Sequence, residues 1–492
     1  MDQTFIGVGR LLQIQFLILA ILIPTELRSE ALPGFTDMVT RADTVYPLNS
    51  AAMPAYLQAV RDSTFGTKVT KITNNSGQSI AAAGASGTWG AIARHHYSKD
   101  QPWSSDGALL AIQNKGASPS QVYLDGETYK VRYAGCSNYS AGDDRWHPSK
   151  SHSQERINVN NNGSELMWFD VTTCTKTRSW TTTPSSRAAQ SGDLPFPVNY
   201  FGPSEGNSSA DGRFIALTDG ARMFVVDMDP VLPLAPYPNR RVGPPTVISD
   251  CGFGSCKVDW VSVSPSGKYA VVNYDGDYPR VYDVNPNTLA LSVRTMPASA
   301  IRCHGTADRG FIYDLGHADM TLNPFDHDED VIIGQEHCGN RGRTVSSLLI
   351  GGVMMVRIRD GSITPLTDPT NEAYPHHVST RNFDRPGWAY VGYYPEDSKR
   401  FADEIIAVKL DGSKAVQRFA QKHSNFSSCY ECESHPVPSR DGRRVIWASN
   451  WAINCSSCGS SSEVKDYVVD ARSPLPGVDA VSPANPRNLR EE

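Results

Sequence analysis

The chain has 492 residues, and its 46 Lys and Arg against 52 Asp and Glu give a formal net charge of only −6. This balance provides neither a basic field for a nucleic acid partner nor an acidic tail. Gly (39 residues) and Pro (33 residues) are abundant, and the sequence lacks long helical periodicity. Together these features indicate many short strands separated by turns, so an all-β fold is expected.

The first thirty residues have the pattern of a secretory signal peptide. Arg10 precedes an apolar run from Leu11 to Ile23, which ends in a polar stretch containing the small residue Ser29. The run is too short to cross a bilayer comfortably, so we expect cleavage near Ser29, with an uncleaved anchor as the alternative. No later stretch is long and apolar enough to span a membrane. Residues 1–29 are therefore predicted to be removed from a secreted or periplasmic protein.

One hairpin unit recurs along the rest of the chain. It consists of a strand, a turn of the type Ser-x-Asp-Gly and a second, apolar strand, with clear copies at Gly107, Gly212, Gly267 and Gly442. Asp-Gly supplies the positive φ that a tight hairpin requires. Degenerate copies at 145–150, 322–330 and 381–387 raise the number to seven, with a period of about 55 to 60 residues.

Seven such units predict a seven-bladed β-propeller that forms a single closed domain over residues 30–472, followed by a flexible tail at 473–492. The last unit lacks a fourth strand. Residues 68–73 are predicted to supply it within the blade that contains residues 467–471. Two separate all-β domains are the alternative, although the even period argues against them. We expect a monomer.

Several stretches resemble the propeller polysaccharide lyases, which include ulvan lyases and oligogalacturonate lyases, within the TolB-like group of propellers. The stretches are residues 65–73, 94–103, 376–381, 438–442 and 448–451, and the resemblance spans about residues 45 to 472. It implies a propeller fold and a β-eliminating activity on an anionic, uronate-containing polysaccharide.

Propeller geometry brings the starts of the inner strands together around a central channel, and these segments are rich in His, Arg and carboxylates. β-Elimination requires neutralisation of the uronate carboxylate, which suits Arg, and proton transfers, which suit His or Tyr. We predict His96 and Tyr97 for proton transfer and Arg145 for neutralisation. The predicted substrate contacts are His95, His147, Glu205, His317, His376 and His377. For each histidine the alternative is a purely structural hydrogen bond that caps an inner strand.

Other functions were weighed against the lyase. Glu205 and Glu433 could form the acid and base of a glycoside hydrolase. No Gly-x-Ser-x-Gly elbow follows a strand, which argues against a serine hydrolase. A non-catalytic propeller that binds carbohydrate or protein stays open. No cofactor is expected to be required, and structural zinc or calcium also stays open.

The ten cysteines of a predicted exported protein favour disulfides over free thiols. They occur as neighbours in the sequence, which favours local bridges. Zinc is the alternative at two places, around the seventh and the fifth hairpin, because paired Cys and His there have ligand chemistry. The paired residues are Cys136 with Cys174, Cys251 with Cys256, Cys429 with Cys432, Cys455 with Cys458, and Cys303-His304 with His337-Cys338.

Overall fold

The structure is a computed structural model that describes residues 38–80, 86–140, 142–160, 162–182, 193–199, 205–228, 241–252, 257–338, 351–427, 429–453 and 463–471. All of these belong to one unit of the chain, residues 33–492. The predicted signal segment, the predicted tail, Cys256, Cys455 and Cys458 lie outside the described residues. Within the described ranges, no helix has the length and apolar character needed to cross a membrane.

The described residues form β-strands joined by turns, and they contain no α-helix. The all-β prediction is therefore confirmed. Single turns of 3₁₀-helix occur in three described connections: η1 (Lys150–His152), η2 (Ala307–Arg309) and η4 (Tyr430–Cys432).

The predicted hairpin turns share one hydrogen-bonded geometry. Gly107, Gly212, Gly267 and Gly442 all have φ between 67° and 77°, a region that glycine enters without steric cost. In each turn the serine three residues before the glycine accepts a backbone N–H through its hydroxyl, at 2.9 to 3.2 Å. The repeated sequence pattern therefore corresponds to a repeated local structure.

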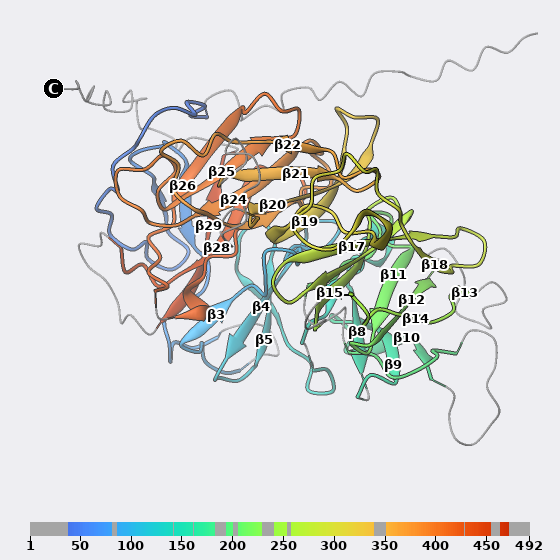
Figure 1. The fold of residues 1–492 in the computed structure, drawn as a ribbon. Helices are drawn as coiled ribbons and strands as arrows, with labels where there is room; N and C mark the ends of the chain where they lie inside the picture. Colours follow the sequence, from blue (N-terminus) through green and yellow to red (C-terminus); the bar gives the residue numbers. More distant parts are fainter. Residues whose placement is uncertain are drawn as a thin grey trace, which may run out of the picture. The chain divides into compact units, whose positions relative to one another are not determined.

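Five sheets contain four strands each, and consecutive strands within them pair antiparallel. In all but one of them the strands follow one another in sequence order, and in the exception β13 and β14 both pair with β12 (Figure 1). The first two sheets contain β7 (Arg145–Trp146), β8 (Glu155–Asn160), β9 (Glu165–Asp170) and β10 (Thr175–Thr181), then β11 (Phe214–Thr218), β12 (Arg222–Asp227), β13 (Arg241–Val242) and β14 (Thr246–Val247). The other three contain β15 (Val258–Val263), β16 (Tyr269–Tyr274), β17 (Tyr278–Val284) and β18 (Leu291–Val293), then β19 (Leu315–Asn323), β20 (Glu329–Glu336), β21 (Val353–Arg357) and β22 (Ile363–Pro365), and finally β23 (Pro375–Ser379), β24 (Trp388–Tyr393), β25 (Glu404–Lys409) and β26 (Val416–Gln421).

A sixth sheet of nine strands joins the two ends of the described chain. Lys68–Lys71 pairs antiparallel with Tyr467–Asp470, so the upstream strand joins the sheet that contains residues 467–470, as predicted. A short parallel pairing of β29 with β3 links the two halves of this sheet. Its strands are β1 (Ala59–Arg61), β2 (Lys68–Lys71), β3 (Ile92–Arg94), β4 (Leu109–Lys115), β5 (Gln121–Asp125), β6 (Val131–Ala134), β27 (Val437–Pro438), β28 (Arg444–Ser449) and β29 (Val464–Asp470).

The core lies between successive sheets. Val271 and Val281 of one sheet pack in a buried cluster with Ile332 and Met354 of the next. The opposite face of β20 contributes Val331 to a second cluster, shared with the sheet of β23–β26. Because both faces of the middle strands are buried, these strands are nearly continuous apolar runs. This packing fixes the sheets against one another and positions the starts of their first strands.

Candidate functional site

Three first strands begin with a shift in pairing register. The shifts occur near the starts of β15, β19 and β23, and the residues at them are Asp259, His317, and the pair His376 and His377. His317 has a φ of 45°, which is uncommon for a residue with a side chain. A bulge re-aims the side chains of its strand. The irregular pairing therefore changes the direction of these polar side chains, which in a regular strand would point alternately to opposite faces of the sheet.

The rings of His317, His376, His377 and His435 lie against one another, and we call them the imidazole cluster. The His377 ring centre is 4.2 Å from that of His317, 4.1 Å from that of His376 and 4.0 Å from that of His435. Ring nitrogens of His317, His376 and His377 lie within 4.8 Å of one another. Imidazole nitrogens this close can converge on a single metal ion.

Burial keeps these imidazoles neutral. It lowers the pKa of His376 to about 2, with nearby His317 and Lys422 adding to the effect. Burial, reinforced by neighbouring cationic groups, also lowers the pKa of His377 and of His435 well below the usual value. His317 is shifted down as well, mainly through burial. Neutral rings keep the lone pairs that metal binding requires.

Hydrogen bonds determine which ring nitrogens are available to bind a metal. Arg94 donates to Nδ1 of His435, and because a guanidinium can only donate, Nε2 of His435 carries the proton. Oε2 of Glu433 lies 3.2 Å from that Nε2 and 3.0 Å from Nε2 of His377. Nδ1 of His377 is buried and has no hydrogen-bond partner. A histidine that donates one nitrogen to a carboxylate and leaves the other free matches the arrangement of metal-ligating histidines.

Burial raises the pKa of Glu433 to about 7, although Arg94 opposes this shift. The carboxyl group therefore changes its charge close to neutral pH. Its ionised form is the better acceptor for the two imidazole N–H groups.

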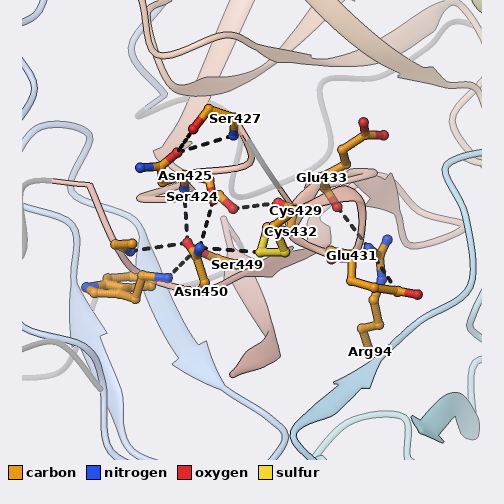
Figure 2. The surroundings of a disulfide bond; sticks show 12 residues. Arg94, Ser424, Asn425, Ser427, Cys429, Glu431, Cys432, Glu433, Ser449 and Asn450 are labelled. Atoms are coloured by element: carbon orange, nitrogen blue, oxygen red, sulfur yellow. Dashed lines mark hydrogen bonds and ion pairs between the residues drawn. A yellow bond between two sulfur atoms is a disulfide. The ribbon is translucent and has the colours of Figure 1, made fainter. Parts of the chain in front are cut away.

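Glu433 follows a disulfide-closed loop (Figure 2). Cys429 and Cys432 are bonded to each other, and the Cys432 carbonyl accepts a hydrogen bond of 2.6 Å from Ser424. Asn450 donates to the sulfur of Cys432, and Arg94 donates to the carbonyl of Glu433 at 3.0 Å. These bonds hold the backbone from which Glu433 reaches the imidazole cluster.

Tyr97 lies beside the cluster. Its Oη is 3.3 Å from Nδ1 of His317, and its ring centre is 4.4 Å from that of His435. Burial, followed by the charge of Glu205, raises the pKa of Tyr97 well above its usual value. The phenol is therefore a protonated group that can donate.

Lys99, Glu205 and Asp259 adjoin Tyr97. Lys99 pairs with Glu205, and its Nζ is 4.3 Å from the centre of the Trp260 ring. Burial, with the Glu205 charge adding to it, raises the pKa of Asp259 to about 6. Lys99, Glu205 and Trp260 also line a hollow of about 630 Å³. A sizeable open space is thus connected to the polar groups beside the cluster.

His96 belongs to a different environment, which we call the carboxylate network. Its Nε2 is 3.1 Å from Asp143 and its Nδ1 is 3.5 Å from Asp100. Burial alone would lower the pKa of His96, but the bonds to Asp100 and Asp143 outweigh it and raise the pKa. Asp100 also lies 3.9 Å from Arg145 and 3.8 Å from Arg156.

Arg145, predicted to neutralise a substrate carboxylate, is 6% exposed. Its Nη1 donates to the carbonyls of Asp143 and Asp144, at 2.8 and 3.2 Å. The residue also lines a second hollow, of about 540 Å³. Its guanidinium is thus largely occupied by the protein itself.

Two of the predicted substrate contacts do not belong to the cluster. Both ring nitrogens of His95 are bonded, at 2.9 Å to Asp466 and at 2.7 Å to the carbonyl of His435, and the side chain is fully buried. His147 accepts a hydrogen bond from the backbone of Ser149 and is 1% exposed. Both side chains are thus held by hydrogen bonds within the protein.

The cysteine and histidine group at the fifth hairpin is also brought together. Cys303 and Cys338 form a disulfide, with Cα atoms 5.7 Å apart. His304 bonds to Asp314, and Nδ1 of His337 lies 2.7 Å from Asp277. The pair Cys136 and Cys174 is likewise bonded. These local bridges agree with the predicted neighbours.

Sequence reasoning did not find the roles of Arg94, Asp100 and Lys99, and it considered Glu433 only as a hydrolase residue. Glu433 stands two residues before His435, so its position in the sequence could have indicated that it lies near this histidine. The position of Arg94, which sets the tautomer of His435, required the pairing of β3 with β29.

No family model and no curated protein matches the sequence. Similar solved structures include an oligogalacturonate lyase in complex with manganese and an oligogalacturonate lyase from Vibrio parahaemolyticus. Each has 11% identity and a TM-score of 0.48, covering 86% of this chain and 98% of that chain. A β-propeller domain from Myceliophteria thermophila has 12% identity and a TM-score of 0.31, covering 61% of this chain and 95% of that chain. Similarities at this level carry no argument about activity.

Proposed function

We propose that this protein is a secreted, metal-assisted lyase that cleaves an anionic, uronate-containing polysaccharide by β-elimination. The observation that carries the proposal is the imidazole cluster, where three neutral histidines converge next to the protonated phenol of Tyr97. Neutral imidazoles and a proton donor side by side fit a reaction in which an anion is bound and a proton is delivered.

The residues fit a divalent transition metal at His317, His376 and His377. Nδ1 of His377 is a buried acceptor without a partner, and Glu433 accepts its other nitrogen. Imidazole ligands suit zinc, iron, nickel or copper, and three protein ligands leave positions for substrate. When bound, such an ion supplies Lewis acidity that neutralises a uronate carboxylate and thereby acidifies the neighbouring C5 proton.

The chain's own residues supply the proton transfers. Asp259, whose pKa is about 6, is ionised at neutral pH and takes the C5 proton. The C4–O bond breaks as the C4=C5 double bond forms, and Tyr97 donates its proton to the leaving oxygen. Solvent then reprotonates Tyr97 and deprotonates Asp259. In this scheme His96 transfers no proton and Arg145 does not neutralise the reacting carboxylate, so both differ from their predicted roles.

The architecture that we propose around this site is a seven-bladed β-propeller. The five four-stranded sheets supply five blades, and the two halves of the nine-stranded sheet supply two. The pairing of β2 with β29 then joins the last blade to the start of the chain. We also propose a monomer that acts outside the cytoplasm, where its disulfides persist.

The test is incubation of the mature protein with a panel of polyuronates while the absorbance of the unsaturated product is followed. We expect a rise in absorbance that a chelator abolishes and a transition metal restores. Tyr97→Phe should lose turnover. His327→Asn is the matched control, because His327 is exposed in the β19–β20 turn and Asn tolerates its positive φ.

Two outcomes would replace the proposal. New reducing ends without an absorbance change would favour hydrolysis. Stoichiometric metal binding without turnover on any polyuronate would favour a non-catalytic, carbohydrate-binding protein.

A further inference from the structure

A second polar pocket lies at the pairing of β2 with β29. Lys71 is directly opposite Tyr467 in the antiparallel register, so the two side chains share one face of the sheet. Lys465 is two residues before Tyr467 and shares that face, whereas Asp466 points to the other face and bonds to His95. We call the hollow at Lys71, Lys465 and Tyr467 the lysine pocket.

Lys71 is a buried cation that has no carboxylate of the described chain within ion-pair distance. Its residue is 2% exposed, and its Nζ donates to Asn75 and, at 3.6 Å, to the sulfur of Met53. It forms no ion pair with any described residue. Burial of an unpaired ammonium is costly, so such a group is normally paired or loses its proton.

Lys465 adds a second positive charge. It is 2% exposed, its Nζ donates to the carbonyls of Gly90 and Ala91, and it lies 3.4 Å from the carboxylate of Glu463. Glu463 also accepts the backbone N–H of Ser76 at 3.2 Å. Two cations and one carboxylate therefore line the pocket, which leaves one positive charge in excess.

The pocket also contains an unused donor. The hydroxyl of Tyr467 is buried and has no hydrogen-bond partner. Together with Lys71, Asn75 and Asn450 it lines an open hollow of about 330 Å³. A buried hydroxyl without a partner costs free energy comparable to a lost hydrogen bond, which a ligand in the hollow could recover.

We propose that the lysine pocket binds an oxyanion group, such as a sulfate, a phosphate or a carboxylate, through Lys71 and Tyr467. The anion supplies the missing counter-charge of Lys71 and the missing acceptor of Tyr467, while Lys465 strengthens the positive field. Glu463 limits the affinity by repulsion, and its bonds to Ser76 and Lys465 hold it in place.

The neighbouring segment cannot supply this counter-charge. Residues 454–462, which precede Glu463, contain neither Asp nor Glu. Alternatively, Lys71 could lose part of its proton, since burial and the nearby Lys465 charge lower the pKa of Lys71 to about 8, although the charge of Glu463 opposes this shift. At neutral pH Lys71 is nevertheless mostly protonated, so it can attract an anion.

The test measures binding of sulfate, phosphate, glucuronate and glucose 6-sulfate to the mature chain by calorimetry, in chloride buffer of matched ionic strength. We expect saturable binding of at least one of them, weakened about tenfold or more in Lys71→Gln, since a charged hydrogen bond is lost. Inorganic ions binding best would identify a free ion, and the sugars binding best would identify an acidic glycan.

Lys68→Gln is the matched control, because Lys68 lies on the same strand but pairs with Asp470 and points to the other face. It should bind like the wild type. Tyr467→Phe keeps the ring and should weaken binding by a smaller factor. Undiminished binding in Lys71→Gln, or no binding of any of the four anions, would overturn the proposal.

Lys71→Met provides a measurement that needs no ligand. Replacing an unpaired buried charge by an apolar side chain of similar length should leave the thermal midpoint in chloride unchanged or raise it. A clearly lower midpoint would mean that Lys71 already has its counter-charge, and it would contradict the proposal.

Discussion

The imidazole cluster and the carboxylate network contain the same type of side chain in opposite electrostatic states. His377 is surrounded by His317, His376 and His435, and its pKa falls well below the usual value. His96 lies between Asp100 and Asp143, and its pKa rises. Both rings are mostly shielded from water, so burial alone does not decide the charge. The charge depends on the identity of the nearest partners.

This difference has a functional consequence. A neutral imidazole offers a lone pair to a metal, whereas an imidazolium held by carboxylates has no lone pair to offer, and its charge is already compensated. Metal binding is therefore expected at the imidazole cluster and not at the carboxylate network. The predictions below test this difference, beginning with the largest expected effect.

His377→Ala removes the ligand at the centre of the cluster. Because Lewis acidity contributes several kcal/mol to such reactions, loss of the ion should lower turnover about 10³-fold. Metal content by plasma mass spectrometry should fall in parallel, while His327→Asn keeps both. Full metal occupancy in His377→Ala would show that the ion binds elsewhere.

Tyr97→Phe removes the proposed proton donor but keeps the ring packed against His435. Turnover should fall about 10²-fold or more, with little change in KM, because proton transfer acts in the transition state. Metal content should stay at the wild-type level, which distinguishes this variant from His377→Ala. An unchanged kcat would remove Tyr97 from the mechanism.

Glu433→Gln keeps an oxygen that can accept from His377 and His435 but deletes the charge. Loss of such an outer partner weakens metal affinity about 10- to 100-fold. Protonation of Glu433 has the same effect, so wild-type affinity should fall as the pH falls through about 7. His376 and His377 have much lower pKa values and contribute no change there. The variant should therefore lack this pH dependence, and a wild-type dependence retained in Glu433→Gln would assign it to another group.

The sequence could predict the meeting of Tyr97, His317, His376 and His377, because repeated hairpins place the starts of first strands near one another. It could not separate the roles of His95 and His96. The two residues directly follow β3, and only the structure shows that His95 meets Asp466 whereas His96 meets Asp143.

The charge of each histidine could not be predicted from the sequence either. It depends on partners distant in the chain, such as Asp143 for His96 and Arg94 for His435. The same limit applies to Arg145, whose residue type suits a substrate carboxylate but whose Nη1 donates to backbone carbonyls.

Asp143→Asn has the smallest expected effect and tests the comparison of the two regions most directly. The change keeps an oxygen that can accept from Nε2 of His96 but removes one of the two carboxylate charges that favour the imidazolium. An opposite charge at this distance shifts a pKa by about one unit or more, so the pKa of His96 should fall by that amount. NMR titration of the ring protons measures this shift, and His377 should stay neutral throughout. An unchanged His96 pKa would mean that Asp100 alone, supported by Arg145 and Arg156, sets the charge of the network.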